Sequence, residues 1–196
     1  MDLMQKVTPR QNHQSAVWLG NQCYGITQGL ARIHGVMGDQ MQGGRHGRHG
    51  DLKPENLLWF KDKHVTGAAQ PLNGMLKISD FGLARFHGTH SKSRRASEAG
   101  FTTTQKAPEY DVLHKISPKY DIWSLGCVLL DLTTWYLEGY DAFDNFSKER
   151  AKDDEKYPRV TQIAEDTFYV YDQIDRPYKA WVKSSVVNVS KLQVLA

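Results

Sequence analysis

Two short stretches of this chain carry side chains that suit phosphoryl transfer. Residues 49–56 read His-Gly-Asp-Leu-Lys-Pro-Glu-Asn, and residues 80–82 read Asp-Phe-Gly. Together they supply three carboxylates, of Asp51, Glu55 and Asp80, with one amide and one ammonium group. Carboxylate and amide oxygens are hard ligands that suit Mg²⁺. Because phosphoryl transfer leaves little covalent work to the protein, positioning and charge neutralisation dominate its catalysis. The residue types therefore indicate a metal-assisted phosphoryl-transfer site.

These stretches resemble the signatures of protein kinases. Residues 49–56 resemble the kinase catalytic loop and residues 80–82 its metal-binding turn, and Ala-Pro-Glu at 107–109 resembles the end of the activation segment. The sequence Lys-Pro-Glu-Asn at residues 53–56 resembles that of serine/threonine kinases at this position. Three motifs in the family's order are far more specific than any one of them alone. The alternative for 49–56 is an ordinary surface turn, since its residues are common in loops.

The resemblance implies a role for each polar residue of the two stretches. Asp51 would accept the proton of the substrate hydroxyl or orient it, and Lys53 would meet the charge on the transferred group. Asn56 and Asp80 would hold Mg²⁺, with Lys53 also contacting the nucleotide. Leu58 would lie under the adenine ring, although simple core packing is its other interpretation. The implied cofactors are ATP and Mg²⁺, and the implied partner is a protein substrate with a serine or threonine hydroxyl.

A second set of residues would support the site without touching the substrate. By the resemblance, Thr102 would brace the catalytic acid and lysine, and Asp121 would accept hydrogen bonds from the catalytic-loop backbone. A helix N-cap is the alternative role for Asp121. The supporting residues that the resemblance implies are His49, Phe81, Gly82, Thr102, Glu109 and Asp121.

The hydrophobic pattern predicts the elements that would position these residues. Residues 14–34 are predicted as an amphipathic helix ended by Gly35, and 57–60 with 75–78 as a hairpin. The apolar run after Asp121 is predicted as a buried helix over 119–137.

The glycine-rich stretch at residues 35–50 is predicted as a loop with no regular element. Its Gly-Arg-His repeat over 44–50 leaves two alternatives open. One is an RNA contact, which lacks aromatic residues for base stacking. The other is a metal site, which has two histidines and no third ligand.

The composition argues against several classes of function but does not identify one. The chain has 196 residues and a net charge of +3 from 25 basic and 22 acidic residues, which does not favour nucleic-acid binding. Its two cysteines make no disulfide framework. The longest apolar run stops at Asp131, too short for a membrane span. We expect an intracellular, cytoplasmic protein, and the sequence gives no indication of its oligomeric state.

The sequence departs from the kinase pattern in four places. Residues 1–13 contain no glycine-rich loop and no strand lysine, which kinases carry in a small lobe before the catalytic loop. Gly50 replaces an arginine that in the family pairs with a phosphorylated activation segment. Gln105 replaces a tyrosine of the peptide-docking surface. No clear partner for Glu109 is visible, since none of the arginines after residue 110 has a recognisable setting; these are Arg150, Arg159 and Arg176.

The resemblance implies an α+β, protein kinase-like fold: a mainly α large lobe with a small β-hairpin. Residues 1–196 would form one partial kinase domain, clearly kinase-like over 14–140 and divergent over 141–196. The implied function is transfer of the ATP γ-phosphate to Ser/Thr hydroxyls, with this polypeptide inactive on its own. Two other interpretations stay open, a non-catalytic pseudokinase-like interaction module and a shortened piece of an active kinase.

Overall fold

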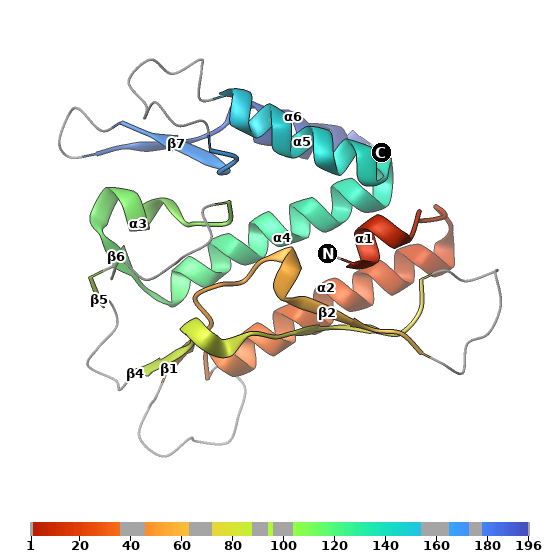
Figure 1. Cartoon of the computed structure of the whole chain (residues 1–196), viewed down its shortest axis with the longest axis horizontal. Coiled ribbons are helices and arrows are strands. Elements are labelled where there is room, and N and C mark those ends of the chain that lie inside the picture. The colour runs from red at the N-terminus through yellow and green to blue at the C-terminus, as the bar shows by residue number, and fades with distance from the viewer. Residues whose placement is uncertain are drawn as a thin grey trace.

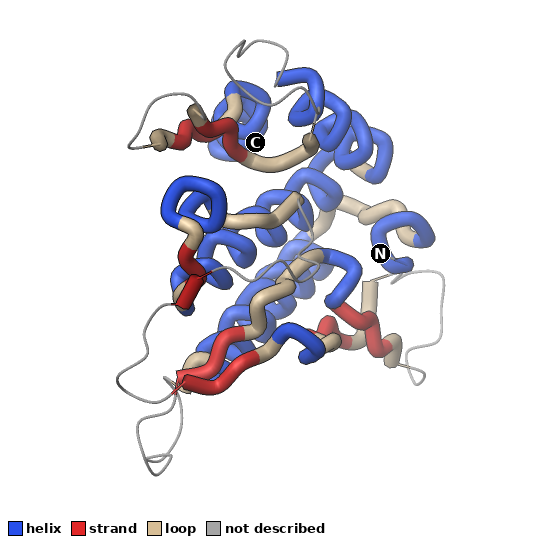
Figure 2. The backbone as a smooth tube through the Cα atoms, turned by 60° about the vertical axis from the view of Figure 1, so that its left-hand side comes forward, coloured by secondary structure: helices blue, strands red, loops and turns tan. Residues whose placement is uncertain are grey.

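Two long helices form the centre of the structure, α2 (His13–Ile33) and α4 (Pro118–Glu138). The computed structural model describes residues 2–35, 46–62, 72–87, 94–95, 104–153, 165–172 and 178–195. In Figure 1 the strand ribbons and the remaining helices lie around these two helices. Figure 2 shows that the strands are short and lie at the edges of a mostly helical body. This agrees with the expected large lobe of mainly helical structure.

Helix α2 begins and ends at residues whose side chains and backbone suit those positions. The Asn12 side chain accepts a hydrogen bond from Ser15 N at 3.0 Å, and Asn12 N donates back to Ser15 Oγ at 3.2 Å. This reciprocal capping box satisfies two of the N–H groups that a helix start leaves unpaired. At the other end Gly35 has φ +75°, the left-handed conformation that glycine adopts without strain. The predicted helix and its stop are confirmed.

The predicted hairpin is also confirmed. Strands β2 (Leu57–Phe60) and β3 (Met75–Ile78) pair antiparallel, with Leu57 opposite Ile78. The hairpin is fastened to α2, because Leu76 N donates to the Gln22 side chain at 2.8 Å and Trp18 Nε1 donates to Gly74 O at 3.0 Å. The hairpin therefore lies at a fixed place against the helix, and its first residue, Leu57, directly follows the catalytic-loop motif.

The prediction of no regular element over residues 35–50 is wrong at its end. Strand β1 (His46–Arg48) pairs antiparallel with β4 (Arg85–His87), and Arg48 lies opposite Arg85. The local sequence is rich in glycine, which has low strand propensity, and its partner lies about forty residues away. Pairing with a distant strand therefore overrides the local preference. Among the described residues, no group of three His, Cys, Asp or Glu side chains lies placed to hold a metal.

Helix α4 is the core of the molecule. Ser117 caps its start by accepting a hydrogen bond from Lys119 N, and the helix buries Val128, Leu132 and Trp135 almost completely. Trp135 Nε1 donates to Met4 O at 3.0 Å, which brings α1 (Asp2–Lys6) onto the same core. The predicted buried helix is confirmed, and it extends one residue at each end.

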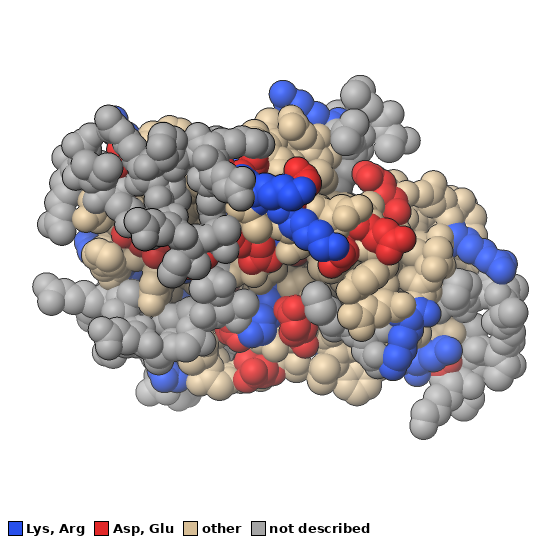
Figure 3. All heavy atoms as spheres, turned by 45° about the horizontal axis from the view of Figure 1, so that its top comes forward, with Lys and Arg blue, Asp and Glu red and all other residues tan. Residues whose placement is uncertain are grey.

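The chain after α4 folds over the other side of that helix. Helices α5 (Tyr140–Asp153) and α6 (Ser184–Leu195) pack on α4 and on each other. The shorter elements are α3 (Pro108–Leu113), β5 (Arg94–Arg95) paired with β6 (Lys115–Ile116), and β7 (Tyr169–Tyr171) paired with β8 (Ala180–Val182). None of the described helices is long and apolar enough to cross a membrane. On the described part of the face in Figure 3, basic and acidic side chains are interspersed.

The run of charged residues at 147–157 is typical of a solvated helix face, but two charged residues of α5 in this run are buried. Arg150 is 1% exposed and Asp153 is fully buried, although Lys148 and Lys152 point to solvent. Asp153 accepts hydrogen bonds from Ser185 N and from the Ser184 hydroxyl, at the start of α6. One face of this polar helix therefore anchors α6 to α5.

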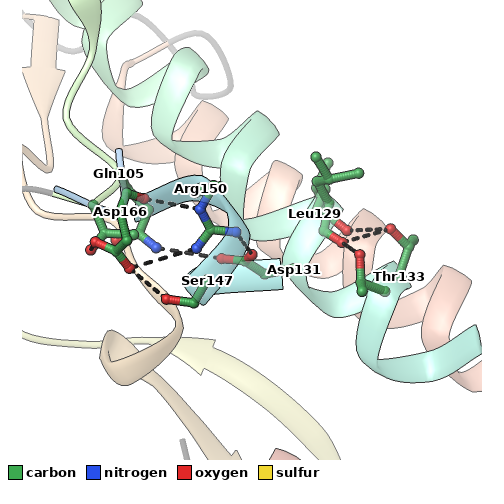
Figure 4. A network of polar contacts seen from close by, with 10 residues as sticks. Gln105, Leu129, Asp131, Thr133, Ser147, Arg150 and Asp166 are labelled. Atoms are coloured by element: carbon green, nitrogen blue, oxygen red, sulfur yellow. Dashed lines mark hydrogen bonds and ion pairs between the residues drawn. The ribbon is translucent and has the colours of Figure 1, made fainter. Parts of the chain in front are cut away.

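Arg150 is the centre of a buried polar network, drawn in Figure 4. Its guanidinium packs over the rings of Phe146 and Phe168, 4.2 Å from each ring centroid. It also reaches Asp131 Oδ1 at 3.5 Å, and its Nε donates to Asp166 O at 2.9 Å. Burial of a guanidinium is costly unless it is paired and hydrogen-bonded. The network therefore ties α4, α5 and the segment before β7 together.

The Asp166 and Asp131 carboxylates extend this network to the activation segment. Asp166 accepts hydrogen bonds from Thr104 Oγ1 at 2.6 Å and from Ser147 Oγ at 2.8 Å. Asp131 lies 3.4 Å from Gln105 Nε2. Burial raises the pKa of Asp131 to about 7, and the nearby Arg150 charge opposes that rise.

The raised pKa of Asp131 predicts a pH dependence of stability. The folded state binds this proton more tightly than the unfolded chain, whose Asp pKa is about 3.9. The contribution of Asp131 to stability is therefore greatest near pH 4 and falls as the pH rises towards 7. We expect the free energy of unfolding of the wild type, relative to Asp131→Asn, to decrease from pH 5 to pH 8 in urea titrations. A constant difference would contradict the assigned pKa.

Removing the Arg150 guanidinium should destabilise the fold. Arg150→Met leaves the Asp131 carboxylate buried without its cation, which typically costs about 3–5 kcal/mol. The matched control is Lys152→Met on the same helix, since that lysine is exposed and surface pairs contribute little. Urea denaturation at pH 8 should show the loss only in the Arg150 variant. Equal midpoints for the two variants would contradict the role of the network.

Candidate active site

The Asp121 carboxylate holds the catalytic loop in shape. Its Oδ2 accepts a hydrogen bond from His49 N at 2.7 Å and its Oδ1 accepts one from Gly50 N at 2.8 Å. Oδ2 also lies 2.8 Å from His34 Nε2, at the end of α2. Asp121 is fully buried, so these donors replace the water that the carboxylate loses. The predicted contact is confirmed, and the alternative role as N-cap is wrong because Ser117 caps α4.

Gly50 stands where only glycine fits well. Its φ is +83°, and a Cβ at this position would lie 3.2 Å from Leu83 O. The same Cβ would lie 3.4 Å from the Nε of Arg48, a buried arginine of β1 whose pKa burial lowers. The departure from the family's arginine therefore has a backbone reason here: the left-handed conformation turns two N–H groups toward Asp121.

Asp51, Lys53 and Asn56 lie together on the loop. Lys53 Nζ is 3.0 Å from Asp51 Oδ2. The Asn56 amide nitrogen donates to Asp51 Oδ2 at 3.0 Å and to Asp51 O at 2.8 Å. Pro54 begins the short 3-10 helix Pro54–Asn56, which turns the asparagine back toward the acid. The structure thus places an acid, a cation and an amide within direct contact.

The turn at residues 79–82 places Asp80 beside this cluster. Ser79 donates from both N and Oγ to Asn56 O, at 2.8 and 2.9 Å. Asp80 follows with φ +60°, and its carboxylate accepts a hydrogen bond from Gly82 N at 3.2 Å. Positive φ in a non-glycine residue is uncommon and often marks a functional turn. The turn begins the short 3-10 helix Phe81–Leu83.

His49 joins the loop to this turn. Its Nε2 lies 3.0 Å from Ser79 O, and its ring meets the Phe81 ring edge-on with centroids 5.3 Å apart. His49 itself is fully buried. The histidine therefore joins the catalytic loop to the Asp-Phe-Gly turn through Ser79 and Phe81.

The donor set fits a magnesium ion. The amide nitrogen of Asn56 is used by Asp51, so its Oδ1 faces away and receives no hydrogen bond from the described residues. The Asp80 carboxylate is exposed and uses one oxygen for Gly82 N. An amide oxygen and a carboxylate are hard ligands that Mg²⁺ accepts, with water and phosphate oxygens completing its octahedron.

Apolar side chains beside the site face solvent. Leu58 on β2 is 48% exposed and Phe81 in the turn is 54% exposed. Phe60 and Met75 on the same hairpin are also more than half exposed. Large exposed apolar residues that cluster beside polar groups favour a ligand or a partner surface.

The remaining predicted residues lie outside the cluster or outside the described chain. Thr102 falls outside the described residues. Glu109 on α3 is half-buried, and its carboxylate has no ion pair with any residue that the structure describes. Arg150 instead pairs with Asp131, which sequence analysis did not single out. A signal for it was present, since Phe146 and Arg150 are four residues apart and meet on one helix face.

Comparison with known proteins agrees with this geometry. The family profile described as "Protein kinase domain" matches residues 2–187. The chain is 39% identical to Cyclin-dependent kinase 7 of Dictyostelium discoideum over 103 residues, which are 51% of this chain and 25% of that protein. It is 35% identical to Serine/threonine-protein kinase nekl-2 of Caenorhabditis elegans over 112 residues, 57% of this chain and 24% of that protein.

A third relative is the human 3-phosphoinositide-dependent protein kinase 1, 33% identical over 90 residues, which are 44% of this chain and 14% of that protein. The chain thus spans at most a quarter of the length of these relatives. The profile nevertheless covers almost the whole chain, and the loop, the turn and the central helix have the expected contacts. The chain belongs to the protein kinase family.

Proposed function

We propose that this chain supplies the large-lobe half of a serine/threonine kinase site that uses ATP and Mg²⁺. The observation that carries the proposal is the contact cluster of Asp51, Lys53 and Asn56, with Asp80 directly beyond it. The Lys-Pro-Glu-Asn wording of residues 53–56 supports a serine or threonine hydroxyl as the acceptor. The names of two relatives that are serine/threonine or cyclin-dependent kinases agree with this choice.

In the proposed reaction the substrate oxygen forms a bond to the γ-phosphorus while the bond to the ADP oxygen breaks. Asp51 orients the hydroxyl and receives its proton. Lys53, 3.0 Å from that carboxylate, sits where it meets the charge on the transferred phosphoryl group. Asn56 Oδ1 and Asp80 would hold magnesium, which neutralises the phosphate oxygens.

Catalysis also needs the other wall of the nucleotide cleft. In kinases a glycine-rich loop covers the phosphates and a strand lysine orients them. Residues 1–13 contain neither sequence. Leu58 and Phe81 are correspondingly exposed where the other wall would lie. A non-catalytic interaction module is the second candidate, and the exposed apolar side chains of Leu58 and Phe81 favour a binding surface there.

Residues 1–196 alone should show no phosphotransfer. Misplacing reacting groups by about 1 Å already costs on the order of 100-fold, and here a whole wall of the cleft is lacking. The measurement is incorporation of radiolabel from ATP and Mg²⁺ into a generic basic protein, compared with Asp51→Asn. Incorporation clearly above that control would show that the second wall is dispensable.

Joining residues 1–196 behind a kinase small lobe should restore turnover, since both walls are then present. In that chimera Asp51→Asn should lower kcat by about 100-fold or more while ATP still binds. Asp80→Asn should instead abolish the Mg²⁺-dependent turnover, since it removes a carboxylate ligand of the metal. The control is Asp144→Asn, which removes an exposed carboxylate that pairs with Lys148 on α5. It should change neither ATP binding nor turnover. A chimera that binds Mg²⁺ and ATP without turnover would favour the non-catalytic module.

A further inference from the structure

One face of the central helix α4 is open, although its other faces are buried. Lys119, Ile122, Gly126 and Leu130 follow one another at spacings of three and four, so they share a face of the helix. Ile122 is 55% exposed and Gly126 is also exposed. These four residues are called here the α4 stripe. Within the described part of the chain, this apolar helix therefore has no packing partner over Ile122 and Gly126.

The α4 stripe is the floor of a large groove. The groove has a volume of about 970 Å³, with Leu113 of α3 on one side and Val182 of β8 and Val186 of α6 on the other. Leu113 is 59% exposed and Val182 is 45% exposed. Figure 1 shows α3 near the start of α4 and the α5–α6 layer along the rest of that helix. The groove is thus an elongated apolar surface along a helix, of the kind that marks an interaction site.

Gly126 indicates what kind of element the groove accepts. A glycine inside a helix costs roughly 1 kcal/mol relative to alanine. A Cβ at this position would meet nothing within 4 Å, so the described packing does not require a glycine. A second helix lying in the groove would make use of it, because the missing side chain lets another backbone approach closely.

The charges around the groove favour an acidic occupant. Lys115 and Lys119 line it and are both exposed, whereas Glu109 is the one carboxylate among the described lining residues. Oppositely charged residues at a rim speed association and set the register of the bound partner.

We propose that this groove binds an acidic amphipathic α-helix of a partner protein. The apolar face of that helix lies along the α4 stripe over Gly126, and its carboxylates face Lys115 and Lys119. The groove is built by α3, β6, α4, β8 and α6, and it is not lined by Asp51, Lys53, Asn56 or Asp80. The proposal therefore stands independently of phosphotransfer.

The test uses a fluorescent synthetic peptide of about 16 residues, long enough to follow the α4 stripe as a helix. Leucines at spacings of three and four form one face, and glutamates form the other. Fluorescence anisotropy with residues 1–196 should show saturable binding. Gly126→Leu should weaken it by roughly tenfold or more, since the new side chain fills the floor of the groove. That variant should unfold at the wild-type temperature or higher, because leucine is a better helix former in open space.

Matched controls separate the groove from other causes. Gly20→Leu makes the same change on α2, also at an exposed glycine with nothing within 4 Å, and should leave binding unchanged. Lys115→Glu with Lys119→Glu should weaken binding severalfold and favour a lysine version of the peptide. No saturable binding, equal binding by Gly126→Leu, or equal binding of a scrambled peptide would overturn the proposal. Self-association of the wild type that Gly126→Leu abolishes would assign the groove to a second copy of this chain, and would overturn it too.

Discussion

The Asp121 carboxylate is the contact on which the rest of the site depends. It lies fully buried at the start of α4 and binds two backbone N–H groups of the catalytic loop and the His34 ring at the end of α2. A buried carboxylate is costly unless such donors surround it, so the loop has one favourable path over the helix. That path requires a left-handed residue, which Gly50 supplies. Asp51 then emerges toward the cluster that it forms with Lys53 and Asn56.

A second buried carboxylate on the same helix, that of Asp131, holds together the elements on the opposite side of α4. Asp131 lies ten residues after Asp121, and together with Arg150 it joins α4 to α5 and to the segment before β7. Gln105 and Thr104 bring the end of the activation segment onto this network. Helix α4 therefore positions the catalytic loop through the Asp121 carboxylate. It positions the end of the activation segment through the network around the Asp131 carboxylate. Since the helix is the hydrophobic core as well, packing and site geometry depend on the same element.

Much of this could be predicted from the sequence because the signals are local. The spacing of apolar residues predicted α2, α4 and the β2–β3 hairpin, and Gly35 marked a helix end. The motif at residues 49–56 predicted a compact cluster, since its acid, lysine and asparagine are within five residues of one another. Periodicity and turn chemistry act over a few residues, so the sequence states them directly.

The sequence by itself determined the chemical groups, the long helices and the family. Only the tertiary structure decided which distant residues meet. Strand β1 forms in a glycine-rich stretch because β4 pairs with it. Arg150 is buried, although its helix is rich in charged residues, because it packs on two aromatic rings and pairs with Asp131. Glu109 forms no ion pair with any arginine among the described residues, although kinases pair this glutamate with an arginine near the end of the domain. Such outcomes depend on contacts between segments far apart in the chain, where burial and pairing energies outweigh local propensity.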